Sequence, residues 1–366
     1  MSNYPGRLAL QQRVLPSYRL PFFDELADRC DGGLSVFAGQ PRTDEAIDSG
    51  GELKSARYYQ AHNQHLMKGS LYLCRQPNIL EWLHQWQPDA LIVEANPRYL
   101  STPEAVEWLH AHGRLVLGWG LGAPEMSGPM AAFRQRARDG FLRNLDGIIS
   151  YSQRGADEYQ AIGISPEKIF IAHNAAAPSP VGTPPKRSPK FVGPPSLLFV
   201  GRLQSRKRLD LLFKACAMQN APPRLVIVGD GPDRAEIEAQ AAVEFPQTEF
   251  VGAQYGEELA EFFKQADLFV LPGTGGLAVQ QALSYALPVV VAEGDGTQGD
   301  MVRPENGWLV PPNDLEALSD AIAEAIKDPV RLRKMGVESY RIAQEEINLE
   351  SMTDSFVQAL NQVRIK

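Results

Sequence analysis

The chain has 366 residues and a net charge of −8, with 44% hydrophobic and 22% charged residues. At about 150 residues per domain, this length predicts two domains, and the composition excludes a disordered or fibrous chain. The acidic balance argues against general nucleic-acid binding, because proteins that follow a phosphate backbone carry a basic surplus. It still permits a local basic site for one small phosphate-bearing ligand.

The three cysteines, Cys30, Cys74 and Cys216, are widely spaced. This favours neither a disulfide framework nor a zinc site and predicts a cytoplasmic protein. No apolar run reaches the ~18 residues of a membrane-spanning helix. The first twenty residues contain three arginines and no uninterrupted apolar core, so we do not expect a signal peptide.

In the first half of the chain, short apolar runs alternate with amphipathic stretches. The runs predict strands at residues 8–15, 34–38, 90–95, 115–119, 147–151 and 169–172. The amphipathic stretches predict helices near residues 78–87, 103–112, 130–145 and 153–162. This alternation is typical of a parallel sheet covered by helices on both faces.

A proline-rich segment, residues 178–196, follows this first half. Proline removes backbone donors and fixes φ, so the segment is neither an internal helix nor a central strand. We interpret it as a linker between two domains.

The second half repeats the same alternation. Strands are predicted at residues 197–201, 225–229, 249–252, 268–271, 288–292 and 307–310. Helices are predicted at residues 208–219, 234–245, 257–265, 276–286 and 315–327, and the final stretch, 347–366, also has helical spacing. The chain is therefore predicted to hold two doubly wound α/β domains, whose ligands bind at the carboxyl ends of the strands.

Two loops at such strand ends could bind an anion. Residues 201–208 contain Arg202, Arg206, Lys207 and Arg208 just before a helix, and arginine forks and free helix amides both suit phosphate oxygens. A solvated basic turn is an equally good interpretation of this loop alone. Residues 271–277 are rich in glycine and open another helix, whose free amides would point at a ligand. Because both loops lie in the same half, we favour a shared diphosphate site.

Several other chemistries are disfavoured by missing motifs. Gly229 and Gly231 form only half of a dinucleotide fingerprint, which argues against a nicotinamide dehydrogenase. The chain has no GxxxxGK[ST], HExxH or GxSxG motif. Two acidic residues separated by one position near the second loop occur only at Glu293 and Asp295, so we expect no metal and no cofactor.

The C-terminal half resembles the retaining nucleotide-sugar glycosyltransferases of family 4. The resemblance rests on the order and spacing of these segments: FVGRL at 199–203 with Lys207, VIVGDGP at 226–232, ADLFVLP at 266–272, residues 276–283, LPVV at 287–290 and NG at 306–307. It covers residues 197–325 well and the rest more loosely. In the first half, PSYRLPFF at 16–23 resembles an acceptor-side loop of some members.

The resemblance implies a GT-B architecture, in which two Rossmann-like domains enclose an interdomain cleft. Residues 1–177 would bind the acceptor and residues 197–345 the nucleotide sugar, joined by the linker at 178–196. Residues 346–366 would form a helix that crosses back to the first domain.

The resemblance also implies roles for individual residues. Arg202 and Lys207 correspond to the pair that neutralises the leaving diphosphate, which makes them the catalytic residues of a metal-independent hexosyltransferase. The other donor-binding residues are Gly201, Gly229, Gly231, Val251, Gly273, Thr274, Gly275, Gly276, Leu277, Ala278 and Gln281. The acceptor-side residues are Tyr18, Arg19, Trp119 and Asn174.

The chain departs from the family pattern at two positions. The family has two glutamates eight positions apart, which contact the donor sugar and the ribose, and the corresponding residues here are Gly273 and Gln281. The nearest acids are Glu293, Asp295 and Asp300, in the loop after residue 291. We expect this loop to orient the sugar, although an ordinary acidic surface turn is an equally good interpretation. Leu121 stands where relatives often carry a histidine.

The leading hypothesis is a retaining glycosyltransferase that moves a sugar from a UDP- or GDP-sugar to a glycan, a lipid-linked saccharide or a small molecule. Loss of both glutamates motivates a second hypothesis, a catalytically silent nucleotide-binding subunit. A third is a nucleotide-sugar 2-epimerase, which shares the architecture.

Peripheral contact with the inner face of a membrane is a further hypothesis. Arg134, Arg136, Arg138 and Arg143 lie on a predicted helix with Phe133, Phe141 and Leu142. Such a helix could rest on an anionic surface. We favour the alternative, a helix packed on the sheet, which has the same pattern.

Overall fold

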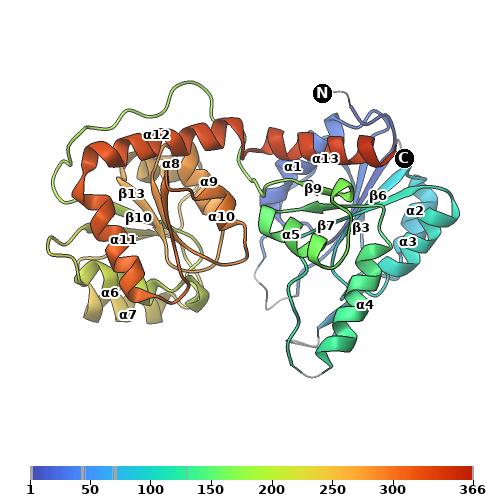
Figure 1. The fold of residues 1–366 in the computed structure, drawn as a ribbon, viewed down its shortest axis with the longest axis horizontal. Helices are drawn as coiled ribbons and strands as arrows, with labels where there is room; N and C mark the ends of the chain where they lie inside the picture. The colour runs from blue at the N-terminus through green and yellow to red at the C-terminus, as the bar shows by residue number, and fades with distance from the viewer. Residues whose placement is uncertain are drawn as a thin grey trace. The chain divides into compact units, whose positions relative to one another are not determined.

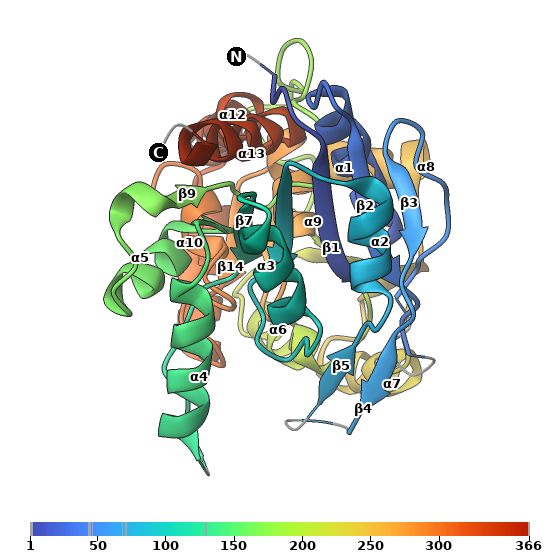
Figure 2. The ribbon, with the colours of Figure 1, turned by 90° about the vertical axis from the view of Figure 1, so that its right-hand side faces the viewer.

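The structure, a computed structural model, describes residues 3–364 except 43, 44, 46, 68, 70, 71 and 129. The chain divides into two compact units. Unit 1 comprises Met1–Ala176 and Leu349–Lys366, and unit 2 comprises Ala177–Asn348. Each unit is built around a parallel sheet flanked by helices (Figures 1 and 2).

The sheet of unit 1 has the strand order β3-β2-β1-β6-β7-β8-β9. Its strands are β1 (Leu8–Val14), β2 (Leu34–Gly39), β3 (Arg57–Gln60), β6 (Ala90–Glu94), β7 (Leu115–Gly120), β8 (Gly147–Ser150) and β9 (Ile169–Ile171). The short strands β4 (Gln64–Leu66) and β5 (Leu73–Arg75) form a separate antiparallel pair. The central strands β6 and β7 are mostly apolar because both faces of the sheet are covered.

The helices of unit 1 lie in two layers. They are α1 (Leu20–Asp28), α2 (Ile79–Trp86), α3 (Thr102–Ala111), α4 (Ala131–Arg143), α5 (Gln153–Ala161) and α13 (Leu349–Arg364). On one face, Phe22 of α1 and Phe356 of α13 pack on Trp119 of the sheet. On the other face, Trp82 of α2 stacks on Phe37 with ring centroids 4.7 Å apart. The last helix of the chain therefore completes the core of the first unit.

The sheet of unit 2 has the order β12-β11-β10-β13-β14-β15. Its strands are β10 (Ser196–Val200), β11 (Arg224–Val228), β12 (Glu249–Gly252), β13 (Leu268–Leu271), β14 (Val289–Ala292) and β15 (Gly307–Val310). Its helices are α6 (Leu209–Ala217), α7 (Arg234–Glu244), α8 (Gly256–Gln265), α9 (Leu277–Ser284), α10 (Gln298–Met301), α11 (Leu315–Lys327) and α12 (Pro329–Glu345). Asp328 caps α12 by accepting hydrogen bonds from two amides of its first turn.

Each of the twelve strands expected from the sequence is present, with ends that differ by at most two residues. Helices α1, α10 and α12 and strands β3, β4 and β5 were not expected. Residues 178–195 form no helix or strand, and Ser196 already belongs to β10. The proline-rich segment is docked on unit 2, because Arg187 donates hydrogen bonds to the carbonyl oxygens of Phe263, Ala266 and Tyr285.

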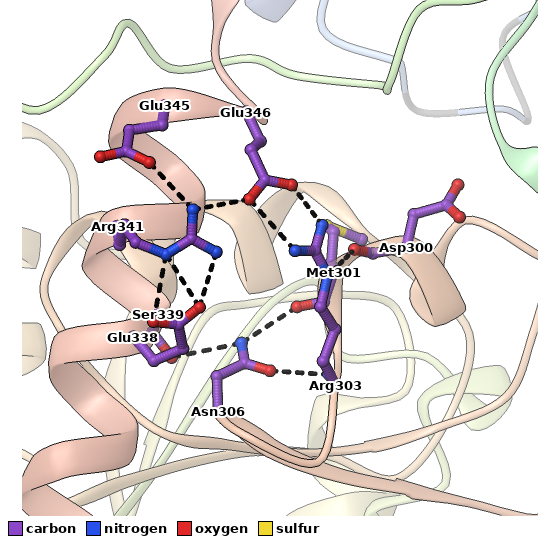
Figure 3. Close-up of polar contacts among 9 residues, drawn as sticks. All are labelled: Asp300, Met301, Arg303, Asn306, Glu338, Ser339, Arg341, Glu345 and Glu346. Atoms are coloured by element: carbon purple, nitrogen blue, oxygen red, sulfur yellow. Dashed lines mark hydrogen bonds and ion pairs between the residues drawn. The ribbon is translucent and has the colours of Figure 1, made fainter.

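An ion-pair network joins the end of α12 to the segment after α10 (Figure 3). Glu346 accepts hydrogen bonds from Arg303 and also pairs with Arg341 at 2.9 Å. Below this network, the buried amide of Asn306 donates to the carbonyl oxygen of Met301 and to the hydroxyl of Ser339. These contacts fix the loop that carries α10 against the longest helix of unit 2.

The two points where the chain passes between the units are held by one side chain. Gln280 of α9 is fully buried, and its amide accepts a hydrogen bond from the backbone N–H of Ala177 at 3.1 Å. The same amide donates to the carbonyl oxygens of Ala177 (3.2 Å) and Ile347 (3.3 Å). Helix α9 is thereby fastened to both ends of unit 2.

Replacing Gln280 by leucine should leave these backbone groups without their partner and lower the free energy of unfolding by about 2–3 kcal/mol. Hydrogen exchange should accelerate in peptides that contain Ala177 and Ile347. The matched control is Gln219→Leu, because Gln219 is also buried and donates to the carbonyl oxygens of Ala215 and Ser319. Gln219→Leu should also destabilise the protein but leave exchange at Ala177 and Ile347 unchanged; equal acceleration in both variants would contradict the assignment.

Candidate functional site

In each sheet, the chain first adds strands toward one edge and then crosses over to add strands toward the other edge. In unit 2 this switch lies between β10 and β13, and in unit 1 it lies between β1 and β6. Ligands of open parallel sheets bind outside the carboxyl ends of the strands at such a switch. In unit 2 the loops at this position are the basic loop, residues 201–208, and the glycine loop, residues 272–276.

Lys207 of the basic loop is held against the glycine loop. Its side chain is 9% exposed, and its Nζ donates a hydrogen bond to the carbonyl oxygen of Thr274 at 2.6 Å. The backbone N–H of Thr274 in turn donates to the carbonyl oxygen of Arg206 at 3.2 Å. The structure therefore brings together the two loops that the sequence singled out.

Of the other three cations of the basic loop, Arg202 is partly buried. Arg206 donates to Gln204 and to the hydroxyl of Thr274. Arg208 pairs with Asp210 at 2.8 Å and also contacts Asn313. Arg208 is thus engaged with a neighbouring carboxylate, whereas Arg206 and Lys207 contact the glycine loop.

Glycines let the two loops approach each other closely. A Cβ atom at Gly275 would lie 2.6 Å from Nζ of Lys207, and Gly275 has φ +147°. Helix α9 begins directly after this loop, with Gly276 as its N-terminal capping residue. The first amides of a helix have no intrahelical acceptor and carry the positive end of the helix dipole, which favours an anion here.

The remaining donor-site candidates have different positions. A Cβ at Gly229 would lie 1.9 Å from the carbonyl oxygen of Gly201, and one at Gly231 would lie 2.2 Å from that of Leu203. These two glycines therefore allow their own loop to pack closely against the backbone of the basic loop. The carbonyl oxygen of Val251 accepts a hydrogen bond from Gln254 at 3.0 Å. Leu277, Ala278 and Gln281 lie in the first turns of α9 and are partly buried.

The pKa of Lys207 is lowered to about 8, mainly by burial and also by the nearby charge of Arg206, while the charge of Asp295 opposes them. Because an anionic ligand needs the charged amine, nucleotide affinity should be constant near pH 7 and weaken as the pH rises through about 8. The folded-state pKa lies below the usual value for lysine, so this group's cost to folding should also disappear between about pH 8 and 10.5.

Calorimetric titration with UDP and GDP between about pH 7 and 10 measures this dependence. In Lys207→Met, affinity should be weak and should not fall through pH 8. A steep fall in the variant as well would assign the titration to another group.

In unit 1, the structure brings the four acceptor-side residues into one cluster. Arg19 is 5% exposed, and its guanidinium lies 5.1 Å from the ring centroid of Trp119 and 5.3 Å from that of Tyr18. It also donates to the side-chain oxygen of Asn174. Tyr151 completes the cluster at 5.9 Å, and burial raises the pKa of its hydroxyl.

A cavity of about 580 Å³ lies beside this cluster, at the carboxyl ends of β6, β7 and β8. Trp119 and Tyr151 line it together with three polar residues that the sequence did not single out, Gln12, Glu94 and Asn96. Burial raises the pKa of Glu94, which also accepts a hydrogen bond from the backbone of Arg13 at 2.7 Å. The position of Glu94 and Asn96 at the end of a predicted strand was the signal that could have found them.

Two further kinds of feature are absent from the residues that the structure describes. There, no three His, Cys, Asp or Glu side chains gather as ligands for a metal ion. None of the helices in this part of the chain is both long and apolar enough to span a bilayer.

Comparison with known proteins supports the resemblance seen in the sequence. Residues 183–341 match the model of the family described as glycosyl transferases group 1. The GDP-mannose-dependent alpha-mannosyltransferase of Mycobacterium tuberculosis (strain CDC 1551 / Oshkosh) is 39% identical over 144 residues, 38% of this chain and 36% of that protein. The O-antigen chain mannosyltransferase C of Escherichia coli is 25% identical over 233 residues, 61% of this chain and 62% of that protein. The chain thus spans less than two thirds of the length of either relative.

Solved structures resemble the whole chain. The lipopolysaccharide outer core galactosyltransferase WaaB has a TM-score of 0.70 at 19% identity, covering 97% of this chain and 99% of that one. Anabaena Alr3699/HepE in complex with UDP also has a TM-score of 0.70, at 15% identity, covering 99% and 100%. These neighbours are GT-B glycosyltransferases, so the predicted fold class is confirmed. The assignment to family 4 stays a prediction.

Proposed function

From a group 1 glycosyl transferase match on a GT-B fold, we propose that the chain is a retaining glycosyltransferase. Its donor is a UDP- or GDP-sugar, and its acceptor is a glycan, a lipid-linked saccharide or a small molecule. The observation that carries the proposal is the buried amine of Lys207 against the glycine loop that opens α9. The names of the relatives, a GDP-mannose-dependent enzyme and a UDP complex, support a nucleotide-sugar donor.

In the proposed reaction, the diphosphate leaves the sugar as negative charge builds on its oxygens. Arg202, Lys207 and the first amides of α9 stabilise this charge, and they do so without reorganising because the fold holds them in place. No metal ion is needed for this stabilisation. The departing phosphate accepts the proton of the acceptor hydroxyl as the new glycosidic bond forms on the same face, which retains the anomeric configuration.

We assign the acceptor to the cavity of unit 1. The aromatic rings of Trp119 and Tyr151 suit the apolar face of a sugar, while Gln12, Glu94 and Asn96 can bind its hydroxyl groups. The position often occupied by histidine in relatives, Leu121, is 47% exposed and also lines this cavity.

Calorimetric titration with UDP, GDP, UDP-glucose and GDP-mannose tests the donor class. We expect one nucleotide series to bind the wild-type protein and to lose affinity in Lys207→Met. No binding of any of the four would contradict the proposal.

The second candidate, a silent nucleotide-binding subunit, is favoured by Gly273, which carries no side chain at the position of a family glutamate. It predicts nucleotide binding without turnover. Release of UDP or GDP from a bound nucleotide sugar that disappears in Arg202→Ala would exclude it, and product analysis by NMR without acceptor separates the transferase from a 2-epimerase.

A cytoplasmic location is proposed, and contact of α4 with the inner face of an anionic membrane is the less favoured alternative to a helix packed on the sheet. Helix α4 extends from unit 1 in both ribbon views (Figures 1 and 2), and Phe133 on it is 68% exposed. Arg136 is also exposed, but Arg138 is buried and paired with Asp139, so it does not belong to this surface. Co-sedimentation with phosphatidylglycerol vesicles, compared with Phe133→Ser, tests the contact; no binding by the wild type would exclude it.

A further inference from the structure

Position 273 has no room for a side chain. A Cβ atom at Gly273 would lie 2.3 Å from the carbonyl oxygen of Arg206 and 2.7 Å from Cα of Lys207. Both neighbours are backbone atoms, so a substituent could fit only if the basic loop moved. The sugar of the donor must therefore be recognised by the amide of Gly273, by Thr274 beside it, or by a side chain from another segment of unit 2.

The loop between β14 and α10 packs directly on the glycine loop. Gln298 is 1% exposed, and its Nε2 donates a hydrogen bond to the carbonyl oxygen of Gly275 at 2.7 Å. Thr297 is 4% exposed, and its hydroxyl oxygen would lie 3.1 Å from a Cβ atom at Gly276. Two buried side chains thus fix this acidic loop against the start of α9.

Asp295 lies in this loop and is held in a defined orientation. Its Oδ1 accepts hydrogen bonds from the hydroxyl of Thr297 at 2.7 Å and from the backbone N–H of Thr297 at 3.2 Å. The residue is nevertheless exposed, so the carboxylate remains accessible to a ligand. It is also close enough to Lys207 for its charge to raise the pKa of that amine.

The other two acids of this loop region are placed differently. Glu293 is exposed, and its backbone N–H donates a hydrogen bond to the carbonyl oxygen of Val310. Asp300 contributes its backbone carbonyl to Arg303, and its carboxylate points away from the ion-pair network (Figure 3). Of these three acids, Asp295 is therefore the one that the structure links to Lys207 of the basic loop.

We propose that Asp295 is the residue that recognises the sugar of the donor, accepting hydrogen bonds from its hydroxyl groups. This inference rests on the proposed function. An ionised carboxylate only accepts hydrogen bonds, and with Oδ1 bonded to Thr297 its Oδ2 can accept from a hydroxyl. Because the diphosphate is itself anionic, Asp295 adds nothing to the affinity for free nucleotide. Its contribution to affinity therefore depends on the sugar.

The experiment compares how much the sugar adds to affinity in three proteins. Wild type, Asp295→Asn and Glu293→Gln are titrated calorimetrically with UDP and UDP-glucose, and with GDP and GDP-mannose. For the series that binds the wild type, the ratio of the nucleotide Kd to the nucleotide-sugar Kd should fall about tenfold in Asp295→Asn, as expected for loss of one charged hydrogen bond. Free nucleotide should bind as well as before or more tightly. Glu293→Gln, a matched change in the same loop, should keep the wild-type ratio.

Each result has a distinct meaning. An unchanged ratio in Asp295→Asn, or equal loss of free-nucleotide affinity, overturns the role of Asp295 while leaving the proposed function intact. Absence of all nucleotide binding in the wild type overturns the proposed function and this inference with it. A thermal-unfolding midpoint measured for each variant identifies loss caused by misfolding. In that case Thr297→Val, which removes only the hydroxyl contact to Asp295, should lower the ratio in the same direction, and an unchanged ratio there overturns the role.

Discussion

Replacing Lys207 by methionine is expected to lower kcat/KM for sugar transfer by about a thousandfold, equivalent to about 4 kcal/mol of transition-state stabilisation. The amine lies against the carbonyl oxygen of Thr274 at the mouth of the glycine loop. Negative charge on the diphosphate is greater in the transition state than in the bound nucleotide sugar, so the loss should appear in kcat more than in KM. Methionine has a similar length, and it removes a buried charge without leaving a cavity.

The measurement is initial-rate kinetics with the nucleotide sugar that binds the wild type. Lys214→Met is the matched control, because Lys214 lies on α6 and is 41% exposed beside Glu244 at 3.8 Å. The control should keep wild-type kinetics. Less than a tenfold loss in Lys207→Met would show that this amine does not stabilise the leaving group.

Replacing Gly273 by glutamate, which restores the family residue, is expected to abolish nucleotide binding rather than improve activity. The new Cβ would lie 2.3 Å from the carbonyl oxygen of Arg206. Relief of this contact requires the basic loop to move, and with it Lys207. We also expect the free energy of unfolding to fall by about 2–4 kcal/mol, as for other overpacked buried sites.

Gly273→Ala separates the steric effect from the charge and should give most of the same loss. The control is Gly299→Ala in α10, where nothing lies within 4 Å of the added Cβ, so stability and binding should be unchanged. Chemical denaturation and calorimetry measure both quantities. Wild-type nucleotide affinity in Gly273→Ala would show that the basic loop and the glycine loop can move apart without loss of binding.

The strands were predictable because each central strand is buried on both faces and therefore reads as a short apolar run. Strand β3 escaped the same reasoning because its residues, Arg57–Gln60, are mostly exposed and polar. Helix α12 was missed although Asp328 and Pro329 form a recognisable start, since much of its surface is covered by charged residues such as Arg341 and Glu338. Local sequence patterns therefore predicted the buried strands, and they missed elements with exposed or charged surfaces such as β3 and α12.

The candidate site was predictable where chemistry and position coincide in the chain, as at Lys207 and the glycine loop. The roles of individual residues were not predictable where they depend on contacts between segments far apart in the sequence. The family resemblance pointed to Gln281 as a donor-binding residue and gave no sign of the neighbouring Gln280, which the helical phase of α9 buries and which has three backbone partners. Glu94 and Asn96 stand at the end of a predicted strand, but only the sheet order places that end at the switch point of unit 1.

The position of α13 sets an order of events during synthesis. Unit 1 takes its first segment from residues before 177 and its last helix from residues after 348, so all of unit 2 is made in between. Until α13 emerges from the ribosome, the apolar face that receives Met352, Phe356 and Leu360 stays uncovered in the nascent chain. Unit 2 has its complete sequence earlier. A chain that ends after residue 348 therefore contains the whole of unit 2 but leaves the core of unit 1 open.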